Sequence, residues 1–80
     1  MYVSAQISLY PLRQKRLSPA IEQAWAILEK NGLGLEKGGM STVVTGEAAR
    51  VFRAVEEVFL ATAEQGPVAL VVTFSNACPT

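Results

Sequence analysis

A strict two-residue alternation near the start of the chain is the feature that most constrains its fold. Apolar residues take every second position over residues 3–9, and Ser4, Gln6 and Ser8 fill the positions between them. Successive side chains of a strand point to opposite faces of a sheet, so this run predicts a strand with one buried face and one polar face. Pro11, which cannot donate to a strand ladder, predicts its end.

Two later runs repeat this combination of β-forming residues with small polar ones. M-S-T-V-V-T-G occupies residues 40–46, and V-V-T-F-S-N-A occupies residues 71–77. Uncharged donors and acceptors gathered on a sheet indicate a surface that recognises a small polar ligand. The chain has no histidine. It therefore offers no Ser/His or Cys/His pair for an activated nucleophile, and its residues predict no metal site.

Apolar residues with helical spacing predict two helices between the strands. Ser18-Pro19 supplies an N-cap with proline in the first turn, and Asn31-Gly32 supplies a left-handed stop after Lys30. Glu47 favours the start of the second helix, because the helix dipole attracts an acidic group there, and Gly66-Pro67 closes it. The apolar stripes of the two helices consist of Ile21, Ala24, Trp25 and Leu28, and of Val51, Val55, Val58 and Phe59.

The order of the predicted elements is strand, helix, strand, strand, helix, strand. Leu33 and Leu35 mark the short second strand, Gly38-Gly39 marks a turn, and residues 41–45 and 68–75 form the last two strands. This order is the split β-α-β pattern of the ferredoxin-like fold, an α+β architecture with a four-stranded antiparallel sheet and two helices on one face. Right-handed crossovers place the first and third strands centrally and the other two at the edges. Residues 1–80 are predicted to form a single domain.

The alternation also predicts which strand residues face the helices. The helix-facing set is Val3, Ala5, Ile7, Leu9, Val43, Leu70, Val72 and Phe74. The open face of the sheet is predicted to hold Ser4, Gln6, Ser8, Thr42, Val44, Val71, Thr73 and Ser75. This second set is uncharged and partly apolar, which is typical of an oligomer interface or a ligand platform.

Composition and charge exclude several classes of partner. Seven Lys/Arg balance seven Asp/Glu, so the chain lacks the positive field that draws proteins to nucleic acid or anionic membranes. Its longest apolar run is far shorter than the roughly 20 residues that span a bilayer. Cys78 is the single cysteine, so no internal disulfide is expected and the predicted location is cytoplasmic, with no signal peptide evident. A domain this short buries only about 60% of its unfolded surface alone, which favours an oligomer.

Three motifs in these strands resemble a known family. S-A-Q-I-S-L-Y-P-L, M-S-T-V-V-T-G-E and V-T-F-S-N-A-C-P together look like the small thiamine-binding, or YkoF-like, family of ferredoxin-like proteins, and they occur in the family's order. The resemblance implies binding of thiamine or its hydroxymethylpyrimidine moiety as a ligand, without a cofactor or established catalysis. It also implies homodimers or homotetramers that form through the sheets.

The predicted ligand site lies on the open face of the sheet, at or near a subunit interface, and combines amides, hydroxyls and an aromatic ring. A side-chain amide such as that of Gln6 or Asn76 offers both a donor and an acceptor to the edge of an aminopyrimidine. A thiazolium cation would rest on the face of Tyr10 or Phe74. The full set of predicted ligand-binding residues is Gln6, Ser8, Tyr10, Met40, Thr42, Thr73, Ser75 and Asn76.

Structural roles and other functions compete with this interpretation. Trp25 is expected in the core, and Arg13, Lys15 and Arg16 fit a solvated loop better than a phosphate site. An acylphosphatase-like enzyme would need a glycine-rich phosphate loop after the first strand, where this chain has Pro11-Leu12-Arg13. An RNA-binding domain would need exposed aromatic and basic residues on its central strands, where this chain has Gln6, Ser8, Thr42 and Val44. A scaffolding or regulatory oligomer without a thiamine ligand is the main alternative.

Overall fold

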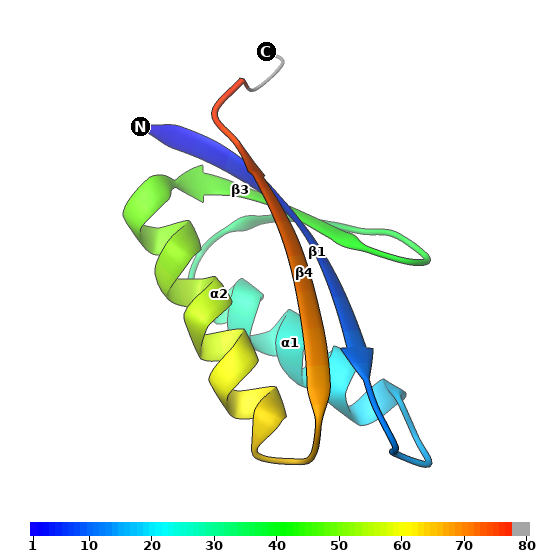
Figure 1. Cartoon of the computed structure of the whole chain (residues 1–80). Helices are drawn as coiled ribbons and strands as arrows, with labels where there is room; N and C mark the ends of the chain where they lie inside the picture. Colours follow the sequence, from blue (N-terminus) through cyan, green and yellow to red (C-terminus); the bar gives the residue numbers. More distant parts are fainter. Residues whose placement is uncertain (78–80) are drawn as a thin grey trace.

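The computed structural model describes residues 1–77 and has the element order that the sequence predicts. The elements are β1 (Tyr2–Pro11), α1 (Ser18–Lys30), β2 (Gly34–Lys37), β3 (Thr42–Glu47), α2 (Ala48–Ala63) and β4 (Val68–Ser75). The strands form one antiparallel sheet in the order β2-β3-β1-β4, as Figure 1 shows, so the first and third strands are central. The predicted ferredoxin-like fold is confirmed.

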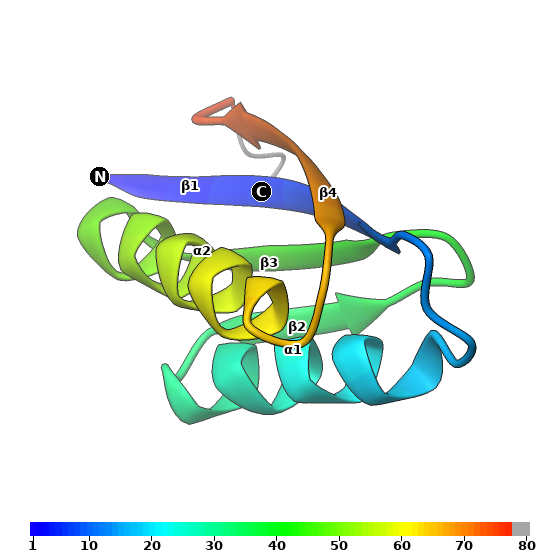
Figure 2. The ribbon, with the colours of Figure 1, turned by 60° about the horizontal axis from the view of Figure 1, so that its bottom comes forward.

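Both helices cover the same face of the sheet (Figure 2). α1 packs against α2 and β2, whereas α2 contacts β3, β1 and β4. The core lies between these layers and includes the completely buried side chains of Val44, Val51 and Val58. Among the described residues, no helix has both the length and the apolar composition needed to cross a membrane.

The helix boundaries agree with the sequence signals, but the first cap does not. Gly32 has a φ of 72° just after α1, so the left-handed stop is confirmed. Ser18 is already the first residue of α1, Leu17 occupies the N-cap, and no side chain caps the helix. The predicted N-cap role of Ser18 is therefore wrong, and its hydroxyl is available for other contacts.

β3 faces the helices through the opposite set of residues from the predicted one. Val44 is aligned with Ala5 and is completely buried, and Thr42 is 8% exposed. Val43, predicted to face the helices, is aligned with Gln6 and lies half-buried on the open face. The assignments of Thr42 and Val44 to the open face were wrong. In the Thr-Val-Val-Thr run of β3, each face of the strand receives one threonine and one valine, so the alternation alone does not show which face is buried.

Gly46 shows what fixes the phase of β3. This residue is aligned with Val3 on the helix side, and a Cβ atom there would lie 2.6 Å from Leu33 Cδ2. Any larger residue at this position would require the Leu33 side chain to move. The same close packing keeps the even-numbered residues of β3 toward the helices.

Two further side chains differ from the predicted burial. Phe59 belongs to the apolar stripe of α2 in the sequence, but it is 43% exposed. Phe74 lies on the helix side of β4 as predicted, where it stacks on Phe52 with ring centroids 4.4 Å apart, and yet it remains 38% exposed. The open face also carries a charge, because Glu36 is aligned with Val43 there.

The register of β3 can be tested with two valine truncations. Val44→Ala removes two buried methyl groups and should destabilise the protein by roughly 2 to 3 kcal/mol, because apolar burial is lost and a cavity remains in the core. Val43→Ala makes the same chemical change on the open face and should cost less than about 1 kcal/mol. Urea denaturation measures both values. A larger loss for Val43→Ala would contradict the register described above.

Candidate functional site

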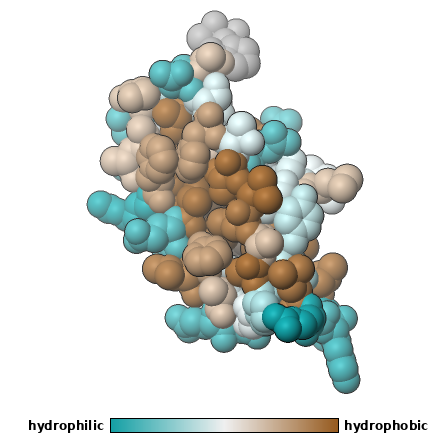
Figure 3. All heavy atoms as spheres, in the orientation of Figure 1, coloured by the Kyte–Doolittle hydropathy of each residue, from teal (hydrophilic) through white to brown (hydrophobic). Residues whose placement is uncertain are grey.

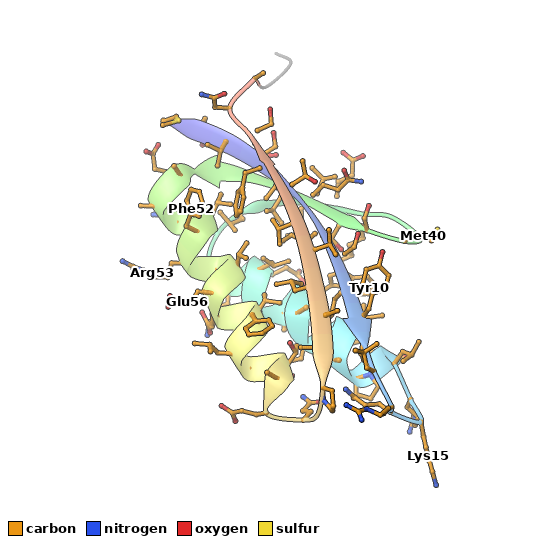
Figure 4. All side chains as sticks on the ribbon, viewed as in Figure 1. Tyr10, Lys15, Met40, Phe52, Arg53 and Glu56 are labelled. Carbon is orange, nitrogen blue, oxygen red and sulfur yellow. The ribbon has the colours of Figure 1, made fainter. Side chains whose placement is uncertain are left out.

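A hollow of about 620 Å³ lies on the helix side of the sheet, between α1, the end of β1 and the loop that joins β2 to β3. One side of α1, from Ser18 to Leu28, contributes one wall, and the loop over residues 38–41 contributes the rim. Figure 4 shows Tyr10 on β1 and Met40 at the tip of this loop, on the same side of the molecule. The volume is within the range of pockets that bind small molecules.

The walls of the hollow are mostly apolar, with aromatic rings among them. Leu28 is buried at one wall, and Ile21 and Leu9 are half-buried beside it. The indole of Trp25 is half-buried, while Tyr10 is 46% exposed. Such a lining favours a flat ligand that leaves water to contact these rings.

A few polar groups open into this apolar surface. Ser18 and Glu22 come from the first two turns of α1. Thr42 is the first residue of β3, and Ser41 directly precedes it. Ser41 Oγ accepts a hydrogen bond of 3.2 Å from Gln6 Nε2, which ties the rim of the hollow to β1. The exposed carboxylate of Glu22 is the acidic group of the lining, so this hollow attracts a positively charged ligand.

Trp25 is held in place by two contacts. Its Nε1–H donates a hydrogen bond of 2.9 Å to Thr42 Oγ1, and the Lys37 ammonium lies 4.7 Å from the centre of its ring. The first contact satisfies the N–H of the half-buried indole. The second shows that the ring already attracts a cation. The position of Trp25 in the hollow is therefore fixed by β2 and β3.

The structure divides the predicted ligand-binding residues between two places. Tyr10, Met40 and Thr42 line the hollow. The other strand residues lie on the open face of the sheet, by their alignment across β1 and β4, and these are Gln6, Ser8, Thr73 and Ser75. Asn76 follows β4, and its Nδ2 lies 3.9 Å from the sulfur of Met1. The predicted set therefore does not form one site, although Gln6 contacts the hollow through Ser41.

Sequence reasoning missed the contribution of α1 to the hollow. Trp25 was expected only in the core, Ser18 only as a cap, and Glu22 was not considered. A usable signal was present, because Ser18 and Glu22 are four residues apart and therefore lie on one side of the helix. Trp25, three residues after Glu22, extends the same side.

A second hollow, of about 500 Å³, lies where the end of α1 meets the start of α2. Arg50 and Arg53 line it together with Lys30 and Glu47. The ammonium of Lys30 pairs with Glu57, and this contact lowers the pKa of the Glu57 carboxyl, with a further hydrogen bond from Asn31. Glu47 pairs with the N-terminal ammonium at 2.8 Å. Two of the four charged groups of this hollow therefore already have partners.

The basic residues weighed as a phosphate site lie outside both hollows. Arg13, Lys15 and Arg16 are exposed in the connection between β1 and α1, and Arg13 adopts a φ of 53°. This placement fits the solvated loop that the sequence predicts. Cys78 lies outside the residues that the structure describes.

Comparison with known proteins identifies the same fold and a family. The YKOF-related family matches residues 2–80 of the chain. No curated protein matches it. A hypothetical protein of Methanocaldococcus jannascii is similar in structure, with a TM-score of 0.88 and 21% identity over 99% of this chain and 84% of that one.

Two further solved structures are similar to this chain. A Streptococcus pneumoniae protein has a TM-score of 0.87 and 22% identity, over 94% of this chain and 86% of that one. A candidate thiamine biosynthesis or salvage protein of Thermotoga maritima has a TM-score of 0.84 and 22% identity, over 94% of this chain and 83% of that one. Structural likeness at this level of identity supports the fold.

The hydrogen bond between Trp25 and Thr42 can be tested by an isosteric change. Thr42→Val keeps the shape of the side chain but leaves the indole N–H without its acceptor, so it should destabilise the protein by about 1 to 3 kcal/mol. Thr45→Val changes the same strand on the open face and should cost less than about 1 kcal/mol, since that hydroxyl can be solvated. Thermal denaturation compares them. Equal melting temperatures for the two variants would show that the hydrogen bond does not hold α1 to β3.

Proposed function

Because the chain belongs to the YKOF-related family, we propose that it is a non-catalytic binding protein for thiamine or its hydroxymethylpyrimidine moiety. The observation that carries the proposal is the hollow between α1 and the β2–β3 loop, where apolar and aromatic walls surround a few polar groups. The likeness to a candidate thiamine biosynthesis or salvage protein supports the same class of ligand.

The hollow suits a flat aminopyrimidine ring. Such a ring gains most when it packs against aromatic and aliphatic side chains, and Trp25 with Ile21 provides such a surface. Its edge carries ring-nitrogen acceptors beside an amine donor. The hydroxyls of Ser18 and Ser41, each able to donate and accept, are the groups that would match this edge.

The charge of the hollow suits the other half of thiamine. The thiazolium ring is a permanent cation, and Glu22 provides a carboxylate in the lining. The ring of Trp25 already carries the Lys37 ammonium, so Tyr10 is the ring that adds attraction of the cation–π type, worth about 0.5 to 2 kcal/mol. The hollow is therefore expected to bind thiamine more tightly than the neutral pyrimidine, and the difference comes from charge.

Of the two uses predicted for the open face of the sheet, oligomer interface and ligand platform, we propose the first. Tyr2 is 65% exposed and Val71 is 56% exposed on this face. We assign this face to contact with another copy of the chain, in line with the expected homodimer or homotetramer. Ligand binding does not require this contact, because the hollow lies on the other side of the sheet.

The proposed ligand can be tested by thermal shift with thiamine, thiamine phosphates and free hydroxymethylpyrimidine. A ligand present at 100 times its dissociation constant stabilises the folded state by about 2.7 kcal/mol. A protein of this size should then melt roughly 10 °C or more higher, since about 1 kcal/mol shifts the midpoint by 4–8 °C. Unchanged melting with all of these compounds, together with flat calorimetric titrations, would favour the scaffolding alternative.

The role of Glu22 predicts a difference between the two ligands. Glu22→Gln removes the charge but keeps the shape, so affinity for thiamine should fall about two- to fivefold, because an exposed charge contact of this kind is worth about 0.4–1 kcal/mol. Affinity for neutral hydroxymethylpyrimidine should stay unchanged. Glu36→Gln makes the same change on the open face and should alter neither value. Calorimetry on the parent and both variants gives the six dissociation constants, and an effect of Glu36→Gln larger than that of Glu22→Gln would place the ligand on the open face.

A further inference from the structure

The second hollow, where the end of α1 meets the start of α2, is lined by two cations that lack a partner. Arg50 and Arg53 come from α2, and neither makes an ion pair within the part of the chain that the structure describes. The other charged residues of the lining are Lys30, which pairs with Glu57, and Glu47, which pairs with the N-terminal ammonium. Each of those pairs is neutral, so the two guanidinium groups are the uncompensated charges of this hollow.

The positions of these arginines are unfavourable for the protein alone. Arg50 lies in the first turn of α2, where the helix dipole is positive, and Arg53 follows three residues later on the same side of the helix. The dipole and the neighbouring like charge both oppose a cation there, and the first turn of α2 contains no acidic residue. Proteins break such local rules chiefly at functional sites. An anionic ligand would supply the missing compensation.

The turn after α1 positions one of the two guanidinium groups. A Cβ atom at Gly32 would lie 3.3 Å from a guanidinium nitrogen of Arg50, so this group rests against the turn. The turn is itself held in place, because Asn31 Nδ2 donates a hydrogen bond of 2.7 Å to the carbonyl of Ile27. Arg53 projects from α2 in Figure 4, and Figure 3 shows hydrophilic surface on this side of the helix, beside the apolar surface in the middle of the view. Arg53 is exposed and is therefore able to turn toward a ligand that Arg50 holds.

We propose that this hollow binds the terminal phosphate of a small phosphorylated molecule between the guanidinium groups of Arg50 and Arg53. A guanidinium presents parallel N–H donors that match two phosphate oxygens, and such charge-assisted hydrogen bonds are stronger than neutral ones. A terminal phosphate carries nearly two negative charges at pH 7, which balances the two arginines. A phosphodiester, as in nucleic acid, has one charge per phosphate and leaves one arginine uncompensated.

The size and lining of the hollow indicate what else the ligand carries. At about 500 Å³ the hollow is within the range of small-molecule pockets, and a phosphate group alone fills a minor part of it. On the α1 side the Nδ2 of Asn31 is engaged by Ile27 and Glu57, while its amide oxygen can accept a hydrogen bond from a ligand hydroxyl. These features favour a polyol phosphate. The inference does not depend on the ligand proposed above, because the two hollows have no lining residue in common.

The test is an NMR titration of the isotope-labelled protein with glycerol 3-phosphate at constant ionic strength. Arg50→Gln and Arg53→Gln should each raise the dissociation constant about threefold, and the double change should raise it roughly tenfold. Arg16→Gln is the matched control, because it removes the same charge from an exposed position outside both hollows, and it should leave the constant unchanged. Dimethyl phosphate, a diester with a single charge, should bind the parent roughly threefold more weakly or less.

The same spectra locate the site, and melting curves separate binding from folding. Amide shifts should change over residues 30–32 and 49–53, while those of Ser18 and Ser41 in the first hollow stay constant. Without ligand, both α2 variants should melt at or above the temperature of the parent, since like-charge repulsion is relieved. Four results would overturn the proposal. These are shifts no larger than sodium chloride causes, equal weakening by Arg16→Gln, equal affinity for dimethyl phosphate, and lower melting temperatures of both α2 variants, which would give the arginines a structural role.

Discussion

The hydrogen bond from the indole of Trp25 to Thr42 is the contact on which the rest of this structure depends. It joins α1 to a central strand, with 2.9 Å between Trp25 Nε1 and Thr42 Oγ1. It directs Thr42 toward the helices, and the alternation of the strand then places Val44 in the core and Val43 on the open face. It also holds the indole at the wall of the hollow. Together with the close packing of Leu33 against Gly46, this polar contact fixes the face of β3, and it holds one wall of the candidate site in place.

The fold was predictable from the sequence because its signals are local and consistent. The alternation of β1, the stop at Gly32 and the bounds of β4 each follow from a few neighbouring residues. The face of β3 was not predictable in this way, because Thr42 and Thr45 flank two valines and both phases bury one valine. The choice depends on contacts with residues far away in the sequence, namely Trp25 and Leu33. Tertiary packing of this kind has no local signature.

The candidate site was predictable only in part for a related reason. Tyr10, Met40 and Thr42 were predicted and line the hollow. The remaining wall comes from α1, where Ser18 was interpreted only as a cap, Trp25 only as a core residue, and Glu22 was not considered. The exposure of Phe59 on α2 was missed because its spacing fits a buried stripe equally well. Periodicity identifies the side of a helix but does not show how far the core extends over it.

Trp25 is the single tryptophan of the chain and lies in the wall of the hollow, so its fluorescence reports directly on the central claim. Titration with hydroxymethylpyrimidine and with thiamine should change the emission of Trp25 in a saturable way, with the same midpoint as calorimetric binding. Stacking of the ligand on or beside the indole and loss of water from the hollow both cause such a change. Calorimetric binding without any change in Trp25 emission would place the ligand elsewhere, and the absence of binding by both methods would contradict the proposed function.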